Sequence, residues 1–280
     1  MSNIKLPFVK MEGLSNSYIF VQADRVRKYN LPKIARHISS RDYGIGADGL
    51  ITIAPDKSPF LIRIFNRDGS EAQMCGNGIR QAALYLKKYH FKNRTKFDIA
   101  TGAGVFSTEI LFSQNNQSRV LASIGAPDFT RDAVGLRGVR KLAFGIKLNY
   151  RGQEFIADCV SVGNPHAVIK VDNFDFPWVE IGRAFSNHKM FKDGVNVHFL
   201  KIDKPSRYAM RIFERGSGTT LGCGSGAAAC LVVGVMRGWL NTKATAEMPG
   251  GNLQLHWDFD SGQIVQTGPA NIICEGEYYI

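Results

Sequence analysis

The chain has 280 residues, 44% of them hydrophobic, so it is long enough to bury one large core or two medium ones. It contains no apolar run of about 18 residues and no signal-peptide-like segment near its start, so we expect a cytoplasmic protein without membrane contact. The formal net charge of +11 comes from basic residues in small scattered groups, which indicates a solvated basic surface and no nucleic-acid partner.

Strand-like segments dominate the chain, and helical segments are few. The predicted strands are rich in Ile, Val, Phe and Tyr, and in chain order they are Tyr18–Val21, Leu50–Ile53, Phe60–Phe65, Val105–Phe112, Val120–Ile124, Phe155–Val162, Ala167–Val171, Val195–Ile202, Tyr208–Phe213, Leu253–Trp257 and Ile264–Thr267. The predicted helices are Leu31–Ser39, Gly78–Tyr89 and Gly226–Arg237. This ratio predicts an α+β fold.

One half of the sequence faintly repeats the other. The segment Glu71-Ala-Gln-Met-Cys75-Gly-Asn-Gly-Ile-Arg matches Thr219-Thr-Leu-Gly-Cys223-Gly-Ser-Gly-Ala-Ala, and in both a Cys-Gly-x-Gly turn leads into a helical run. The step from 75 to 223 is 148 residues, close to half the chain. Two similar halves, each presenting one cysteine, predict a pseudo-symmetric pair of lobes.

Each of these cysteines is a candidate for a reactive group. At the start of a helix, unpaired backbone N–H groups and the helix dipole are expected to lower the pKa of a thiol. The glycines beside Cys75 and Cys223 let the backbone turn tightly and come close to a ligand. A single such cysteine is more often a buried packing residue, but the same turn at both positions favours a functional pair.

Two thiols suit the inversion of a carbon stereocentre. That reaction needs a base on one face of the carbon and an acid on the other, and a thiolate and a thiol supply both. Backbone donors at the two helix starts would stabilise the carboxylate of the developing carbanion. No lysine lies in a recognisable pyridoxal context, and the cysteines and histidines show no metal-ligand spacing, so we expect no cofactor and no metal.

The two cysteine segments resemble the signature segments of the diaminopimelate epimerase family. The likeness extends through Lys10-Met-Glu-Gly-Leu-Ser-Asn16, Gly44-Ile-Gly-Ala-Asp-Gly49, Val162-Gly-Asn164-Pro-His166-Ala, Gly194-Val-Asn196-Val, Met248-Pro-Gly-Gly251 and Thr267-Gly-Pro-Ala270. The resemblance implies interconversion of LL- and meso-diaminopimelate, on the way to lysine and peptidoglycan, by two cysteines without a cofactor.

The resemblance also implies roles for other residues. Arg215 and three asparagines (Asn66, Asn164 and Asn196) would hold the distal amino-acid group of the substrate, with Asn16 nearby, because guanidinium and amide groups suit a zwitterion. His166 and Glu214 would lie near the thiols and hold protons there. The reacting carboxylate would meet backbone donors of Gly76, Asn77, Gly224 and Ser225.

The expected architecture is two α+β lobes, each a curved, mostly antiparallel sheet wrapped around a central helix, with the active site in the cleft between them. We place the N-terminal lobe at residues 1–126 plus 270–280 and the C-terminal lobe at 127–269. The resemblance further implies a homodimer.

Two departures from the family pattern stand out. Ser15-Asn16-Ser17-Tyr18 replaces the usual Gly-Asn-Asp-Phe, and Gly49 stands where some members have Gln. Three alternatives stay open: a histidine, proline or hydroxyproline racemase with the same chemistry, an isomerase of the phenazine-biosynthesis type, and a non-enzymatic basic binding protein with this fold. Arg215 with the three asparagines favours the epimerase over the first alternative, and the two thiols favour it over the second. A flat, aromatic-rich basic surface would support the third, and a closed polar cleft holding both thiols would exclude it.

Overall fold

The computed structural model describes residues 5–138 and 142–279 and divides into two compact units. Unit 1 comprises Met1–Ser123 and Thr267–Ile280, and unit 2 comprises Ile124–Gln266. The division expected from the sequence puts the same two boundaries three residues later. In the described residues, no helix is both long and apolar enough to span a bilayer.

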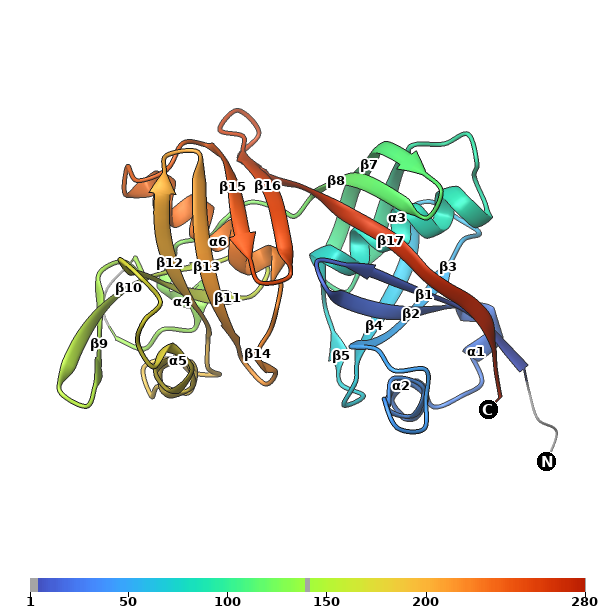
Figure 1. The fold of residues 1–280 in the computed structure, drawn as a ribbon, viewed down its shortest axis with the longest axis horizontal. Coiled ribbons are helices and arrows are strands. Elements are labelled where there is room, and N and C mark those ends of the chain that lie inside the picture. The colour runs from blue at the N-terminus through green and yellow to red at the C-terminus, as the bar shows by residue number, and fades with distance from the viewer. Residues whose placement is uncertain (1–4, 139–141, 280) are drawn as a thin grey trace. The chain divides into compact units, whose positions relative to one another are not determined.

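Unit 1 is a closed sheet around one helix (Figure 1). Its elements are β1 (Lys5–Gly13), β2 (Asn16–Gln22), α1 (Ala23–Val26), α2 (Leu31–Ile38), β3 (Gly49–Ala54), β4 (Phe60–Asn66), β5 (Glu71–Ala72), α3 (Gly76–Tyr89), β6 (Lys96–Thr101), β7 (Gly104–Gln114), β8 (Gln117–Ser123) and most of β17 (Ile264–Tyr279). Within the described residues the strands pair in the cycle β1, β2, β3, β4, β6, β7, β8, β17 and back to β1.

The helix α3 forms the centre of this closed sheet. All its residues from Gly76 to Leu86 are buried, and it packs against β1, β6, β7 and β8. Apolar side chains of the strands and of α3 form one core, among them Phe20, Ile64 and Phe97. A helix that is buried all round is held by packing on every side, so its first turn has a fixed position in the unit.

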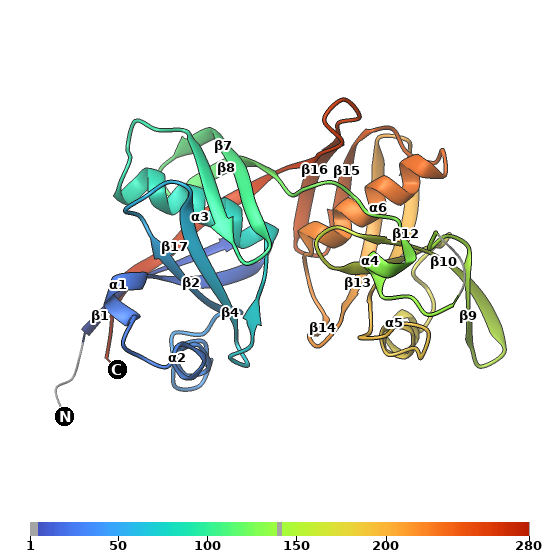
Figure 2. The same cartoon turned by 180° about the vertical axis from the view of Figure 1, so that it is seen from behind.

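Unit 2 has the same plan (Figure 2). Its elements are α4 (Arg131–Val134), β9 (Ile146–Tyr150), β10 (Gln153–Ser161), β11 (Pro165–Lys170), α5 (Trp178–Ser186), β12 (Asn196–Lys204), β13 (Arg207–Glu214), β14 (Gly218–Thr219), α6 (Gly224–Met236), β15 (Lys243–Met248) and β16 (Gly251–Trp257). The strands pair in the order β9, β10, β11, β12, β13, β15, β16. The apolar helix α6 packs against β10, β11, β12, β15 and β16.

The two units repeat each other element by element. From β1 and β10 onward, corresponding elements begin 147 to 149 residues apart, as Gly76 of α3 and Gly224 of α6 show with a step of 148. The pairing directions repeat as well, because β2–β3 and β11–β12 are both parallel, and so are β4–β6 and β13–β15. The predicted α+β fold with two pseudo-symmetric lobes, each a curved sheet around a central helix, is confirmed.

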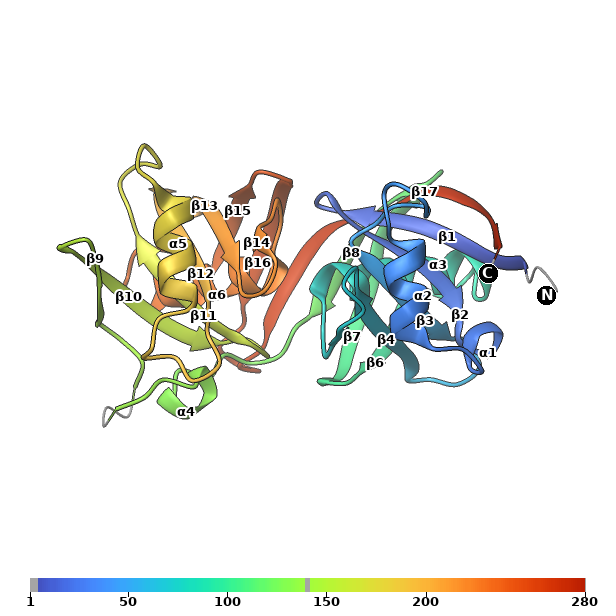
Figure 3. The same ribbon diagram turned by 90° about the horizontal axis from the view of Figure 1, so that it is seen from below.

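The helix α5 was not predicted from the sequence. It corresponds to α2, and each of the two packs on the outside of its own sheet, α2 against β3 and β4 and α5 against β12 and β13 (Figure 3). Ile181 and Phe185 are its buried contacts with the core. The repeat step applied to the predicted helix at Leu31 would have located it near residue 179.

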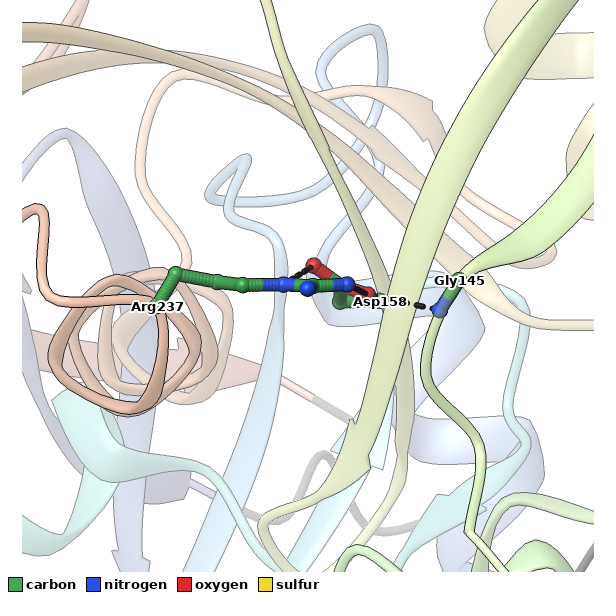
Figure 4. A network of polar contacts seen from close by, with 3 residues as sticks. All are labelled: Gly145, Asp158 and Arg237. Carbon is green, nitrogen blue, oxygen red and sulfur yellow. Dashed lines mark hydrogen bonds and ion pairs between the residues drawn. The ribbon is translucent and has the colours of Figure 1, made fainter.

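A buried carboxylate ties the far end of α6 to the sheet of unit 2 (Figure 4). Arg237 donates from Nε and Nη2 to the two carboxylate oxygens of Asp158, at 2.7 and 2.5 Å, and the backbone N–H of Gly145 donates to the same group at 2.8 Å. Asp158 lies on β10 and is almost fully buried. Its three donors satisfy the buried charge, and the ion pair holds the C-terminal end of α6 against β10.

Candidate active site

Cys75 is the residue that precedes α3, with an extended backbone (φ −146°), so the prediction that it opens a helix is confirmed. Its side chain is partly exposed. The Tyr18 hydroxyl donates to the sulfur at 3.5 Å, and the thiol donates to Asn16 Oδ1 at 3.7 Å. Cys75 therefore lies in a polar setting built by β2 on one side and the first turn of α3 on the other.

A directed chain of hydrogen bonds fixes the orientation of Asn16. The buried guanidinium of Arg80 donates to Asn77 Oδ1, and Asn77 Nδ2 donates to Asn16 Oδ1 at 3.2 Å. Asn16 Nδ2 then donates to Asp48 Oδ2 at 3.1 Å. Because every link has a defined donor, the carbonyl end of the Asn16 amide, and not its amino end, faces the thiol of Cys75.

Asp48, Tyr18 and Arg80 are functional candidates that the sequence reasoning did not assign. Asp48 also accepts a hydrogen bond from the backbone N–H of Ser17 at 2.8 Å, so it anchors the start of β2. Burial lowers the pKa of Arg80 to about 10, which leaves the guanidinium charged at neutral pH. All three lie in or beside the motifs that resemble the family, and their polar side chains in those motifs were the only sequence signal that could have indicated a role in the site.

Cys223 precedes α6 and repeats the position of Cys75, which confirms the second predicted helix start. Its sulfur accepts the backbone N–H of Gly226 at 3.3 Å and lies 3.6 Å from Ser225 Oγ. The expectation that the helix start lowers the thiol pKa is wrong here. Burial and then the charge of Glu214 raise the pKa of Cys223 well above its ordinary value, and they outweigh the donors from Ser225 and Gly226.

Glu214 lies beside Cys223, at the end of β13. Thr220 Oγ1 donates to its Oε1 at 2.6 Å, and the short pairing of β13 with β14 places Glu214 opposite Gly218. The carboxylate is close enough to Cys223 to raise the pKa of the thiol both by its charge and by a hydrogen bond. This is the arrangement in which a carboxylate and a thiol can exchange a proton.

Asn196 holds the backbone around Arg215. Its Nδ2 donates to the carbonyl of Pro165 at 3.0 Å, and its Oδ1 accepts the backbone N–H of Arg215 at 2.9 Å. The Arg215 guanidinium is exposed and donates from Nη1 to the carbonyl of Asp193 at 2.7 Å. Asn196 thus positions Arg215, whose remaining donors are available to a carboxylate.

His166 is fully buried on β11 and contacts two polar side chains, the predicted site residue Asn164 and the unpredicted His198. Its Nε2 is 2.8 Å from Asn164 Oδ1, and its Nδ1 is 2.8 Å from Nε2 of His198. Burial first, then His198 and Arg215, keep the pKa of His166 well below its ordinary value. The ring is therefore neutral at physiological pH.

Asn66 ends β4, directly opposite Gly49 on β3. Its Nδ2 donates to Ser70 Oγ at 3.0 Å, which closes the turn that follows. A Cβ at Gly49 would lie 2.1 Å from the carbonyl oxygen of Phe65, so this backbone accepts only glycine there. The Gly49 departure is thus a packing requirement of this chain.

The remaining predicted residues, Gly76 and Asn77 in unit 1 and Gly224 and Ser225 in unit 2, are the first residues of α3 and α6. The structure links Cys75, Asn16 and Asn77 in one network, Cys223 with Ser225 and Glu214, Asn196 with Arg215, and Asn164 with His166. Asn66 bonds to Ser70 instead. Across the described ranges, no group of three or more His, Cys, Asp or Glu residues is placed to hold a metal ion.

Solved structures with this fold cover nearly the whole chain. A hydroxyproline epimerase from Agrobacterium vitis superposes with a TM-score of 0.70 at 13% identity, covering 98% of this chain and 91% of that one. A phenazine biosynthesis protein of the PhzF family from Bacillus anthracis gives 0.68 at 17% identity, covering 99% and 100%. At such low identity these likenesses establish the fold.

Curated relatives match at much higher identity. The diaminopimelate epimerase of Methanococcus maripaludis is 36% identical over 97% of this chain and 99% of its own length. That of Bacillus mycoides is 37% identical over 97% and 96%. The family model described as diaminopimelate epimerase matches residues 8–130 and 158–273. The chain therefore belongs to the diaminopimelate epimerase family.

Proposed function

We propose that this protein is a diaminopimelate epimerase that interconverts LL- and meso-diaminopimelate, an isomerase of lysine and peptidoglycan precursor synthesis. The observation that carries the proposal is the repeated placement of one cysteine before each central helix, at Cys75 and Cys223. Full-length similarity to curated diaminopimelate epimerases supports the choice of substrate over the histidine, proline and hydroxyproline alternatives.

The proposed mechanism is a two-base proton transfer at the α-carbon. One cysteine, as thiolate, removes the α-proton while the other, as thiol, protonates the opposite face, and the roles exchange with direction. Backbone N–H groups of Gly76 and Asn77, and of Gly224 and Ser225, would donate to the carboxylate as negative charge develops on it. A carboxylate next to Cys223, from Glu214, favours the thiol form of that residue between turnovers.

The distal amino-acid group of the substrate would be held by Arg215 with Asn66 and Asn164. The exposed guanidinium of Arg215 supplies charge-assisted donors for a carboxylate, and Asn196 fixes the backbone from which it extends. A proline or histidine ring has no second carboxylate for these groups. The arrangement therefore favours a substrate with two amino-acid heads.

The experiment that tests the function is incubation in deuterated water with LL-diaminopimelate, and separately with histidine, proline and lysine. Deuterium incorporation and chirality at the α-carbon are followed by NMR. We expect deuterium incorporation only with diaminopimelate among the four substrates, together with formation of the meso isomer. Incorporation only into proline or histidine would instead identify a racemase of the other type, and none with any substrate would exclude the enzymatic proposal.

Variants of the cysteines test the mechanism. Cys75→Ala and Cys223→Ala should each abolish epimerisation. The matched control is Cys230→Ala, because Cys230 lies within α6, the helix that Cys223 precedes, and is buried in the core beyond the first turn. Full activity in either of the first two variants would refute the two-thiol mechanism.

We propose that the protein works in the cytoplasm, because a mechanism with two reduced thiols suits a reducing compartment. We also propose a homodimer, which light scattering of the purified protein at micromolar concentration will test. A mass near the 31.0 kDa of one chain would exclude it.

A further inference from the structure

His198 is a buried side chain on β12 to which the proposed mechanism assigns no role. It lies two residues beyond Asn196, on the same face of the strand, and its exposed fraction is 0%. Its ring is 5.0 Å from that of His166 between centroids, and the two rings are joined by the 2.8 Å contact from Nε2 to Nδ1. His198 is therefore the far end of a chain that runs through His166 to Asn164.

The direction of this chain follows from the buried end. Nδ1 of His198 is buried and has no hydrogen-bond partner among the described residues. A proton on that nitrogen would be an unsatisfied buried donor, whereas a lone pair there costs less, so the proton belongs on Nε2. Burial lowers the pKa of His198 to about 3, so a second proton is not bound at neutral pH.

The remaining positions are then determined one by one. Nε2–H of His198 donates to Nδ1 of His166, which must be the unprotonated nitrogen of that ring. The proton of His166 is consequently on Nε2, and this N–H donates to Asn164 Oδ1. The carbonyl of Asn164 is used within the protein, and its Nδ2 amino group is the end left to meet a ligand.

We propose that His198 is a positioning residue that, through the tautomer of His166, sets Asn164 to present its amide N–H donors to a carboxylate of the substrate. This inference rests on the proposed function, since it assigns the group that Asn164 recognises. If the chain ran in the opposite direction, the Asn164 carbonyl would face the ligand and would favour an ammonium group instead.

Close packing holds the His198 ring in this position. A Cβ on Gly226 would lie 2.3 Å from Cε1, 2.6 Å from Nε2 and 2.9 Å from Nδ1 of His198, so the ring lies directly against the glycine backbone. Gly226 is in the first turn of α6, and its N–H is the group that donates to Cys223. The same turn of α6 therefore positions the thiol of Cys223 and packs against the ring of His198.

The first test is spectroscopic and needs no activity. Long-range proton–nitrogen correlation spectra of the full chain, labelled with ¹⁵N at histidine, should show both rings protonated on Nε2 alone at pH 7. A proton on Nδ1 of either ring would overturn the proposal. Because the ligand-free protein is used, this result is independent of whether diaminopimelate is the substrate.

The second test uses substrate recognition. In Asn164→Asp the new carboxylate still accepts the bond from His166 but replaces the amino group with an oxygen, so we expect KM for LL-diaminopimelate to rise about tenfold or more with a smaller change in kcat. An unchanged or lower KM would mean that Asn164 faces an ammonium group, and would overturn the proposal.

The third test addresses His198 itself. His198→Leu removes the donor to His166, and we expect KM to rise about three- to tenfold while the His166 nitrogen signals change. His198→Gln keeps an N–H donor at a similar reach and should restore most of the affinity. A leucine variant with the KM and the His166 spectrum of the parent chain would contradict the role. If the parent chain does not act on diaminopimelate, the proposed function is wrong. The spectra of the ligand-free protein still test the tautomers of His166 and His198 independently of that result.

Discussion

Asn16 Oδ1 accepts a hydrogen bond from the Cys75 thiol, and it is held in that orientation from both ends of its amide. Asp48 takes the Nδ2 side, and Asn77 donates to the oxygen side. Because both ends of its amide are bonded within the protein, Asn16 acts on the Cys75 thiol and not on the substrate. The resemblance had placed Asn16 near the residues that would hold the distal group of the substrate.

Replacing Asn16 with alanine should therefore lower kcat about tenfold or more and leave KM within about threefold, because the thiol loses its oriented acceptor while the distal contacts stay intact. Steady-state kinetics with LL-diaminopimelate measure both constants. Asn187→Ala is a matched control, since that side chain bonds only to its own helix end at Arg183 in the described residues. A rise in KM with kcat preserved would return Asn16 to a substrate-binding role.

Glu214 raises the pKa of Cys223, so its neutralisation should make that thiol more reactive. Because thiolate is the nucleophile, we expect Glu214→Gln to speed the alkylation of Cys223 by iodoacetamide about three- to tenfold at pH 8. Burial still raises the pKa in the variant, so the rate should keep increasing with pH. Peptide mass spectrometry reads the modification residue by residue. Glu180→Gln, an exposed carboxylate on α5, should leave it unchanged, and equal rates in all three chains would contradict the coupling.

The two buried histidines predict a loss of stability in mild acid. Burial depresses the pKa of both His166 and His198, so below about pH 6.5 only the unfolded chain takes up these protons. The free energy of unfolding should fall by about 1.4 kcal/mol per pH unit for each histidine, toward a folded-state pKa of about 3 for His198.

Urea titrations at pH 7.5, 6.0, 5.0 and 4.5 measure this slope. His198→Gln removes one titrating group and should reduce the slope by about 1.4 kcal/mol per pH unit, whatever its effect on stability at pH 7.5. His90 and His188, whose pKa values burial also lowers, keep their contribution in the variant. Carboxylates with lowered pKa, such as Asp68 and Asp128, lose their contribution below this range. An identical slope in the variant would show that His198 is charged in the folded chain.

The turn between β1 and β2 carries strain that a single substitution should relieve. Leu14 and Ser15 have φ angles of 58° and 60°, between the paired residues Gly13 and Asn16. This left-handed conformation costs about 1–2 kcal/mol for a residue with a Cβ, and glycine avoids it. Since glycine also loses more freedom on folding, Ser15→Gly should stabilise the chain by a net amount of up to about 1 kcal/mol.

Urea unfolding at neutral pH measures the Ser15→Gly effect. The control is Ser107→Gly, because Ser107 is exposed in the middle of β7, where glycine should destabilise by about 0.5–1 kcal/mol. Destabilisation by both substitutions alike would mean that the β1–β2 turn is not strained.

Sequence patterns predicted both central helices and most of the long strands of the fold, but they missed β1, β6, β9 and β15. The Cys-Gly-x-Gly turns located both central helices, and the predicted start at Gly78 is only two residues inside the observed start at Gly76. Helix α5 was missed because its short apolar pattern follows Pro177 among loop-like residues. Two short strands, β5 and β14, have two residues each, too few for any periodic signal.

The polar details of the site were less accessible, because they depend on which atoms face each other. Nothing in the order of residues shows that Asp48 holds Asn16, or that His198 lies behind His166. The pKa of Cys223 is the clearest case. A helix start alone lowers a thiol pKa, but the burial of the side chain and the position of Glu214 are set by tertiary packing, and they reverse the direction.

Because of strand β17, the two units can complete their sheets only at different stages of synthesis. Unit 2 is a continuous stretch of chain, whereas the closed sheet of unit 1 needs β17 to pair with both β1 and β8. During synthesis, unit 2 can complete its sheet as soon as its own residues emerge, whereas β1 must wait for most of β17, which follows unit 2 in the chain. Until then two strand edges in the Cys75 half lack their partner, so this half is the one that needs protection from aggregation in a newly made chain.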